Sequence, residues 1–255
     1  MNNDLNIDVR VYPIEEPKGS TVAFASVTFC AGDEPVSAIN SIRVVESENK
    51  AFVAMPQVQT SSGEYKDVAF PVMKGLRGNI SKAVLKELNE VLKAGLPAST
   101  NEPHLYFGGK LPENGAGEIS VEADMNPVSN PRGNTMAYGS VMFKIDDKPF
   151  AVTDNVRIVN SAEKGPFITM PQTQDKEGNY HDIAFPVMKG LRGHITETAL
   201  ASYDKAVSER TADRSNSFSS RIAAGAQKAE EYKQAAAQNP EPAKVAAKKA
   251  PGLGD

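Results

Sequence analysis

The sequence predicts an α+β protein built from two tandem copies of one small domain. Each copy is expected to be an antiparallel sheet of about five strands followed by an amphipathic helix. Three observations support this: a long internal repeat, short β-rich runs separated by turn residues, and apolar residues at helical spacing late in each copy.

The internal repeat is the strongest of these signals. Ala69 to Gly78 recurs residue for residue as Ala184 to Gly193, and 18 of the 26 positions from Met55 to Ile80 match those from Met170 to Ile195. Two copies are too few for a solenoid, in which three or more repeats share a continuous core. We therefore expect two domains of one fold in one chain.

The repeat also sets the expected domain boundaries. Residues 1–96 form copy 1 and residues 119–208 form copy 2. Between them, residues 97–118 contain three prolines and a Gly-Ala-Gly stretch, which is typical of a linker. Residues 209–255 are rich in Ala and Lys and predict a helix over Arg221 to Gln238 and then a disordered tail.

Five strands are expected in each copy, in runs rich in β-branched and aromatic residues. Gly32 to Pro35 and Ser61 to Glu64 have turn composition. In copy 1 the strands are Val9–Ile14, Val22–Phe29, Ile39–Val45, Phe52–Met55 and Val68–Phe70.

The helix follows, and its apolar residues from Ile80 to Leu92 recur at helical spacing. Ser81, or Thr196 in copy 2, is a candidate N-cap, and Gly95-Leu96-Pro97 ends the helix. The matched apolar positions predict the core: Val22, Phe24, Val27, Phe29, Ile42, Val44, Phe52, Val53, Phe70, Ile80, Val84 and Leu88, with their copy-2 partners.

Composition argues against several classes of function. The net charge is −4, from −2 in residues 1–96, −4 in 97–208 and +2 in the tail, so any nucleic-acid site must be a local basic patch. No apolar run is long enough to span a membrane and the N-terminus lacks a signal region, so we expect a cytoplasmic protein. The single Cys30 allows no internal disulfide.

No catalytic or cofactor constellation is found. His104, His181 and His194 lack metal-ligand spacing, and Asp67 and Asp182 have no accompanying nucleophile or second acid. We therefore expect no enzyme activity, metal, cofactor or small-molecule substrate.

Several of these segments resemble those of a known family. Ala25-Ser26-Val27-Thr28, Ile42 to Val45, Phe52 to Pro56, Gly63 to Ala69 and the following Pro-Val and Arg-Gly-x-Ile are similar to the SpoVG septation-protein family. The resemblance implies a compact antiparallel sheet with a helix, pairing into dimers, and a bacterial regulator of septation, sporulation or gene expression that binds DNA or RNA.

Duplication of a unit that pairs with itself places its partner in the same chain, so we expect an intrachain pseudo-dimer. The family's basic loop after Met-Pro reads Gln57 to Thr60 here, which lowers the expected affinity for phosphate.

The best candidate site is the repeated Lys-Gly-Leu-Arg-Gly. Lys74 and Arg77, with Lys189 and Arg192 in copy 2, precede a helix N-terminus, whose free amides favour anions. Alternatively, Arg77 pairs with an acid such as Asp67 and the glycines only shape a turn. Further candidate cations are Lys82 and, in the tail, Lys244, Lys248 and Lys249.

Two functions remain open. One is a non-enzymatic regulator that binds DNA or RNA weakly through these cations. The other is a protein-interaction or structural module of cell division or of a mobile element, without nucleic-acid binding.

Overall fold

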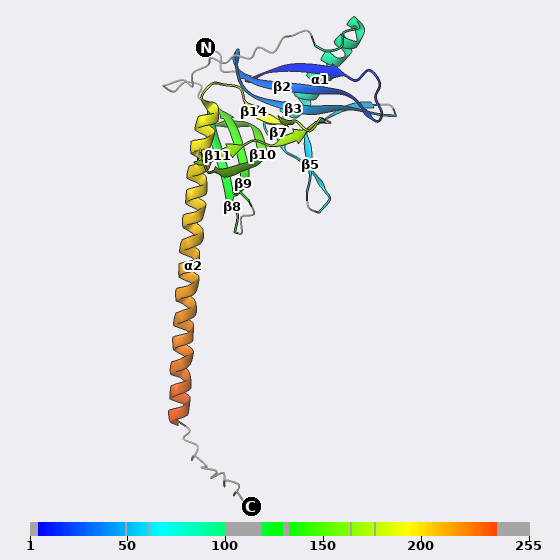
Figure 1. Ribbon diagram of the computed structural model, residues 1–255. Coiled ribbons are helices and arrows are strands. Elements are labelled where there is room, and N and C mark those ends of the chain that lie inside the picture. Colours follow the sequence, from blue (N-terminus) through cyan, green and yellow to red (C-terminus); the bar gives the residue numbers. More distant parts are fainter. Residues whose placement is uncertain are drawn as a thin grey trace, which may run out of the picture. The chain divides into compact units, whose positions relative to one another are not determined.

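The computed structural model describes residues 5–48, 50–60, 62–99, 119–129, 133–163, 165–175 and 177–238, without the side chains of 225, 229 and 232–238. Figure 1 shows its helices and strands. Residues up to Val207 form one compact unit and those from Ser208 onward a second, so each is described by itself.

Both copies have the same order of elements, which confirms the predicted α+β class. Copy 1 consists of β1 (Leu5–Pro13), β2 (Thr21–Ala31), β3 (Glu34–Ser47), β4 (Lys50–Ala54), β5 (Gln57–Gln59), β6 (Tyr65–Asp67), β7 (Ala69–Pro71) and α1 (Leu76–Ala94). Copy 2 consists of β8 (Ile119–Pro127), β9 (Thr135–Ile145), β10 (Lys148–Ser161), β11 (Gly165–Thr169), β12 (Gln172–Gln174), β13 (Tyr180–Asp182), β14 (Ala184–Pro186) and α2 (Leu191–Gln238).

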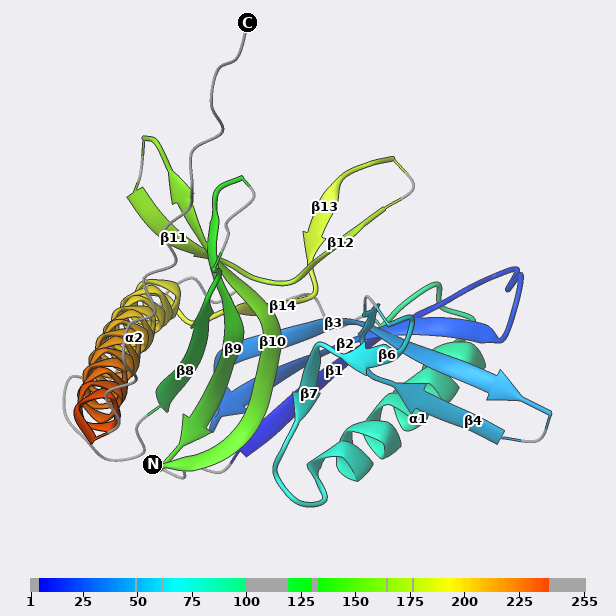
Figure 2. The same ribbon diagram turned by 90° about the horizontal axis from the view of Figure 1, so that it is seen from below.

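The two copies exchange a strand. β14 of copy 2 pairs antiparallel with β3 of copy 1, and β7 of copy 1 pairs with β10 of copy 2, as Figure 2 shows. Each five-stranded sheet is therefore completed by the other copy, and the path through the first sheet runs β1-β2-β3-β14.

A bend in the long strands makes room for the exchange. Ser41 in β3 and Asn155 in β10 have φ values of 59° and 58°. On one side of the bend, β3 pairs with β4 over Arg43 to Ser47; on the other, Ser37 to Ile39 face β14. Since β4 does not reach this part of β3, the β14 backbone supplies the hydrogen bonds that the edge needs.

One hydrophobic core spans both copies. The rings of Phe29 in copy 1 and Phe150 in copy 2 are both fully buried, and their centroids lie 5.3 Å apart. The ring of Phe143 also lies beside that of Phe150, with centroids 6.2 Å apart. The copies are thus joined by shared side-chain packing as well as by exchanged strands.

In copy 1, seven of the twelve predicted core residues are buried, and in copy 2 the partners of Phe24 and Phe52, Tyr138 and Phe167, are exposed. Phe24 is 43% exposed and Phe52 is 50% exposed, while Val22, Val53 and Phe70 are half-buried. In β2 the inward positions belong to Ala23 and Ala25, because α1 packs over the sheet there and small residues fit beneath it. The larger Phe24 therefore points outward, against the prediction.

The helix boundaries also differ from expectation. α1 begins at Leu76 after Gly75, and Ser81 donates a hydrogen bond to the Arg77 carbonyl from inside the helix, so Ser81 is not its N-cap. Thr196 does the same with Arg192 in α2. Gly95 ends α1 in a left-handed conformation, as predicted.

In copy 2 the helix of the domain and the helix predicted over Arg221 to Gln238 are one element. α2 runs without interruption from Leu191 to Gln238, because no proline interrupts the sequence over that span. The predicted tail beyond residue 238, most of the predicted linker, and Lys244, Lys248 and Lys249 lie outside the described residues.

In each five-stranded sheet, a serine hydroxyl accepts a hydrogen bond from the backbone of the outermost strand. Ser99, after α1, accepts a hydrogen bond from the Val11 amide of β1 at 2.9 Å. Ser202 of α2 accepts one from the Met125 amide of β8 at 3.1 Å. These contacts cover part of the free backbone edge of each sheet.

The shared core predicts a single unfolding transition for residues 5–207. Phe150→Ala should lower the free energy of unfolding by about 3–5 kcal/mol, because it empties the centre of a core that both copies need. Urea denaturation followed by circular dichroism measures this. Phe52→Ala, on an exposed side chain, is the control and should change stability by less than about 1 kcal/mol. Two separate transitions in the wild type would contradict the shared core.

Candidate functional site

The repeated Lys-Gly-Leu-Arg-Gly forms the turn between the exchanged strand and the helix in both copies. Gly75 and Gly190 have φ values of 81° and 83°, a left-handed conformation that favours glycine. The amides of Asn79 and His194 then donate to the carbonyls of these glycines. The turns therefore have the same geometry in both copies.

The arginine of each turn is held by an aspartate. Arg77 forms an ion pair with Asp67 of β6, and the other oxygen of Asp67 accepts a hydrogen bond from Gln57 at 2.9 Å. In copy 2, Arg192 lies 3.1 Å from Asp182, which also accepts from Gln172 at 2.8 Å. The arginines thus tie the β5/β6 and β12/β13 hairpins to the helices. An Arg77–Asp67 pair was the alternative to phosphate binding in the sequence analysis.

The lysines in and near these two turns differ from the arginines in their contacts. Lys74, Lys82 and Lys189 are exposed and make no ion pair within the described part of the chain. They remain available to an anionic partner. Arg77 and Arg192 are about half exposed, at 49% and 52% of the side chain, so part of each guanidinium also faces solvent.

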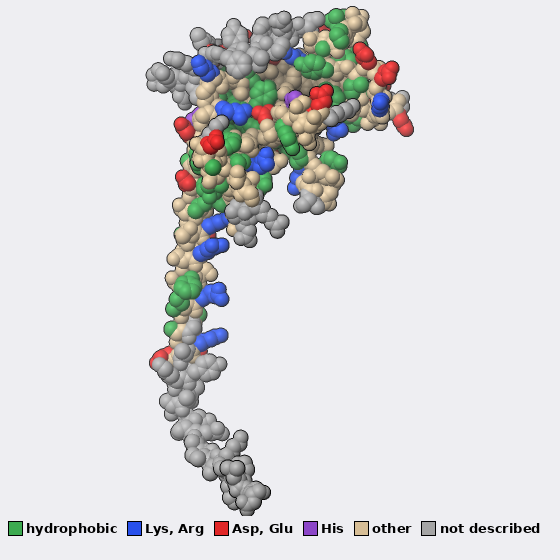
Figure 3. All heavy atoms as spheres, viewed as in Figure 1, with side chains coloured by type: hydrophobic (Ala, Val, Ile, Leu, Met, Phe, Trp, Pro, Cys, Tyr) green, Lys and Arg blue, Asp and Glu red, His purple; other side chains and the backbone are tan. Residues whose placement is uncertain are grey.

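A basic row on α2 was missed by the sequence reasoning. Arg214, Arg221 and Lys228 are seven residues apart, and a seven-residue step returns to nearly the same side of a helix. All three are exposed and have no ion-pair partner among the described residues. Figure 3 shows Lys and Arg side chains along one side of this part of α2. The seven-residue spacing of these cations in the sequence is the signal that could have predicted the row.

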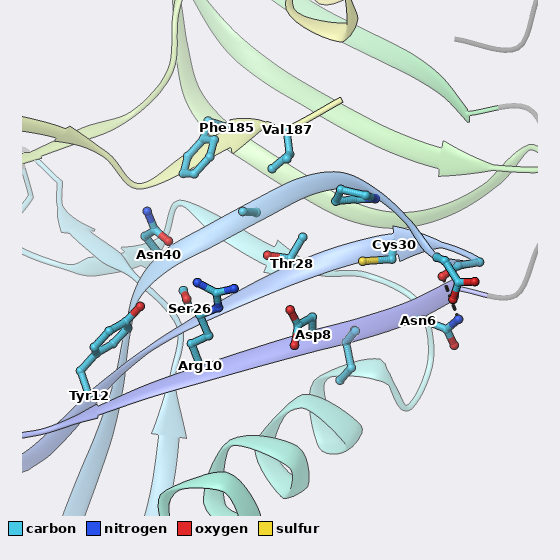
Figure 4. A pocket seen from close by; sticks show the side chains of 15 residues that line it. Asn6, Asp8, Arg10, Tyr12, Ser26, Thr28, Cys30, Asn40, Phe185 and Val187 are labelled. Atoms are coloured by element: carbon cyan, nitrogen blue, oxygen red, sulfur yellow. Dashed lines mark hydrogen bonds between the residues drawn. The ribbon is translucent and has the colours of Figure 1, made fainter. Parts of the chain in front are cut away.

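The outward face of the copy-1 sheet is hollowed. Figure 4 shows the hollow, whose floor is formed by β1 and β2 and whose wall carries Phe185 and Val187 of the exchanged copy-2 segment. Its volume is about 510 Å3. Asp8, Arg10, Tyr12, Ser26, Thr28 and Asn40 also line it.

Cys30 lies at the far end of this hollow. Burial, with added repulsion from Asp8 and Asp33, raises the pKa of its thiol to about 11. The thiol therefore stays protonated at neutral pH, which makes it a poor nucleophile.

Copy 2 has a different outward face. Asp124 and Asp154 occupy the positions of Arg10 and Asn40, and they line a second hollow together with residues of the β5/β6 hairpin. Burial raises the pKa of Asp154 above its ordinary value. Lys144, at the position of Cys30, forms an ion pair with Glu122 at 2.5 Å. The duplicated faces have therefore diverged in charge.

The three histidines do not assemble a metal site in the described residues. His181 lies 2.7 Å from Asp175, and this hydrogen bond holds the pKa of Asp175 well below its usual range. The pair belongs to the exposed β12/β13 hairpin. His104 lies outside the described residues.

None of the described helices has an apolar stretch long enough to cross a bilayer.

Known proteins match both copies. A sequence model of the SpoVG family matches residues 6–90 and 120–205. A septation protein SpoVG of Caldicellulosiruptor saccharolyticus is 35% identical over 88 residues, which cover 34% of this chain and 94% of that protein. One from Clostridium perfringens is 39% identical over 84 residues, covering 33% and 88%. One from Thermoanaerobacter pseudethanolicus is 39% identical over 80 residues, covering 31% and 82%.

The chain therefore belongs to the SpoVG family and carries two tandem copies of its domain. The relatives above match only about a third of this chain because each corresponds to a single copy.

The Asp67–Arg77 pair predicts a measurable coupling. Asp67→Ala and Arg77→Ala, alone and combined, should give a coupling energy of about 0.2–1 kcal/mol in urea denaturation, since the Arg77 side chain is half exposed and solvent screens the pair. The more exposed Lys86–Glu90 pair is the control, with an expected coupling of about 0.3–0.5 kcal/mol. Zero coupling, together with weaker oligonucleotide binding by Arg77→Ala, would assign Arg77 to phosphate instead.

The raised pKa of Asp154 predicts a stabilising substitution. An acid whose folded pKa is raised costs stability when it ionises, and this cost is complete above the folded pKa and absent below the unfolded pKa of about 3.9. Asp154→Asn, which installs the copy-1 residue, should therefore raise stability at pH 7. Urea denaturation at pH 7 and pH 3.5 should show the gain at the higher pH only, and a gain at both would reject the electrostatic explanation.

Proposed function

We propose that this member of the SpoVG family is a non-enzymatic bacterial regulator that binds nucleic acid weakly and with little sequence preference. By analogy with the names of its relatives, its process is septation. Sporulation or gene regulation is the further role that the family resemblance implies. The row formed by Arg214, Arg221 and Lys228 carries the proposal.

The row has the geometry of a backbone contact. Seven residues of helix span roughly 10 Å, so the three cations form a line about 20 Å long. Contacts of this kind neutralise phosphates and release counterions, which gives affinity without reading bases. The absence of described ion-pair partners leaves the three side chains free to turn toward phosphates.

The exposed lysines of the repeated turns add to this proposal. Lys74 precedes α1, Lys82 lies in the second turn of α1, and Lys189 precedes α2. Arg77 and Arg192 mainly hold the hairpins, with the solvent-facing part of each guanidinium as a secondary contact. Lys244, Lys248 and Lys249 are predicted from the sequence to extend the basic surface.

One observation favours the second candidate, a protein-interaction module. Phe218 and Ile222 are 66% and 57% exposed and lie four residues apart on α2, so they form an apolar pair beside the basic row. Large exposed apolar pairs on a helix are typical of partner helices.

Salt dependence separates the two functions. The triple variant Arg214→Ala, Arg221→Ala, Lys228→Ala should weaken duplex binding and reduce the slope of log affinity against log salt by roughly 2–3, because about three phosphate contacts are lost. Fluorescence anisotropy from about 50 to 200 mM salt measures it. The control is a second triple variant, with Lys18→Ala, Lys50→Ala and Lys86→Ala. It changes the net charge by the same amount and should leave the slope nearly unchanged. If the wild type binds neither DNA nor RNA at about 50 mM salt, the protein-interaction function replaces this proposal.

A further inference from the structure

The outward face of the copy-1 sheet carries a row of aromatic and cationic side chains. Tyr12 of β1 lies directly opposite Phe24 of β2, and Phe24 lies opposite Arg43 of β3. Residues directly opposite each other share a face of the sheet, with Cβ atoms about 5 Å apart. Tyr12 is 45% exposed and Phe24 is 43% exposed, so both rings face solvent across the row.

The row continues into the hollow of Figure 4. Arg10 and Ser26 form the next pair along the strands, about 7 Å further on. A smaller hollow of about 250 Å3 beside Tyr12 and Phe24 shares Tyr12, Ser26 and Asn40 with the larger one, so the two are continuous.

A third ring enters this surface from copy 2. The exchanged strand places Phe185 opposite Ala38 on β3, and Figure 4 shows the ring directed toward the hollow. The surface therefore combines three aromatic rings, two arginines, and the hydroxyl and amide groups of Ser26 and Asn40. The carboxylates of Asp8 and Asp33 lie toward the Cys30 end, away from Tyr12 and Phe24.

This chemistry fits unpaired nucleobases on a phosphate backbone. Aromatic rings on a sheet face stack bases, hydroxyl and amide groups hydrogen-bond base edges, and arginines contact phosphate. The bases of a duplex are already stacked on each other and cannot reach such rings, so the surface suits a single strand.

Copy 2 provides the natural comparison. Its face keeps an exposed ring, Tyr138, at the position of Phe24, and β7 places Phe70 opposite Val152 as β14 places Phe185 opposite Ala38. It has Asn126 for Tyr12, Asp124 for Arg10 and Asp154 for Asn40. It therefore has fewer rings and more carboxylates, which repel a polyanion.

We propose that the outward face of the copy-1 sheet is a binding platform for single-stranded nucleic acid, on which bases stack against Tyr12 and Phe24 beside Arg10 and Arg43. This rests on the proposed nucleic-acid function and assigns it a second surface, distinct from the basic row of α2. The copy-2 face takes no part.

The test compares labelled 12-nucleotide single strands of RNA and DNA with the duplex of the same sequence, by fluorescence anisotropy at about 50 mM salt. Tyr12→Ala with Phe24→Ala should weaken single-strand binding at least about 10-fold and leave duplex binding nearly unchanged. Tyr12→Phe with Phe24→Tyr keeps both rings and should stay within about 3-fold of the wild type. Tyr138→Ala, an equally exposed ring on copy 2, is the matched control and should have no effect.

A second variant covers the case in which removing both rings disturbs the fold. Arg10→Asp with Asn40→Asp transplants the copy-2 residues onto copy 1 and should also abolish the preference for single strands. Thermal melting by circular dichroism checks each variant.

The outcomes separate the two claims. Loss of single-strand binding in the face variants, but not in Tyr138→Ala, supports the platform. Unchanged single-strand binding in the face variants, or a wild-type preference for duplex, overturns the platform and leaves the α2 row as the nucleic-acid site. A wild type that binds no oligonucleotide overturns the platform and the proposed function together.

Discussion

The structure depends on a backbone edge that neither copy can satisfy alone. β3 and β10 are each 14 residues long, whereas β4 and β11 have five residues each. The remaining edge, at Ser37 to Ile39 and at Ala151 to Thr153, is paired by the strand from the other copy. Unpaired backbone groups in such a buried position cost free energy, so this pairing fixes how the two copies pack.

The exchange also brings residues from both copies to each outward face. Phe185 and Val187 of copy 2 wall the hollow of copy 1, and the β5/β6 hairpin of copy 1 lines that of copy 2. In a dimer of identical chains, any substitution would change both faces at once. Here each face has changed separately, as Arg10 against Asp124 and Asn40 against Asp154 show. Fusion therefore lets the two faces of a single molecule differ in charge and in chemistry.

The repeat and the apolar spacing were sufficient to predict the fold class, the long strands and the position of α1. The exchange of β7 and β14 could not be predicted, since a three-residue strand fits either edge equally well by sequence. The direction of Phe24 was predicted wrongly because hydrophobicity ranks it above Ala23 and Ala25, and only the packing of α1 reverses that order. In the candidate site, the Asp67–Arg77 pair was foreseen as an alternative. The row on α2 and the proposed copy-1 platform depend on helix continuity and strand register, which the composition does not contain.

The covalent connection between the copies affects behaviour at low abundance. A dimer of separate chains dissociates on dilution and would then lose its exchanged strands and half of its core. In this chain both halves of the Phe29–Phe150 contact belong to one molecule. Its folding is unimolecular, so the folded fraction does not fall when a cell makes only a few molecules.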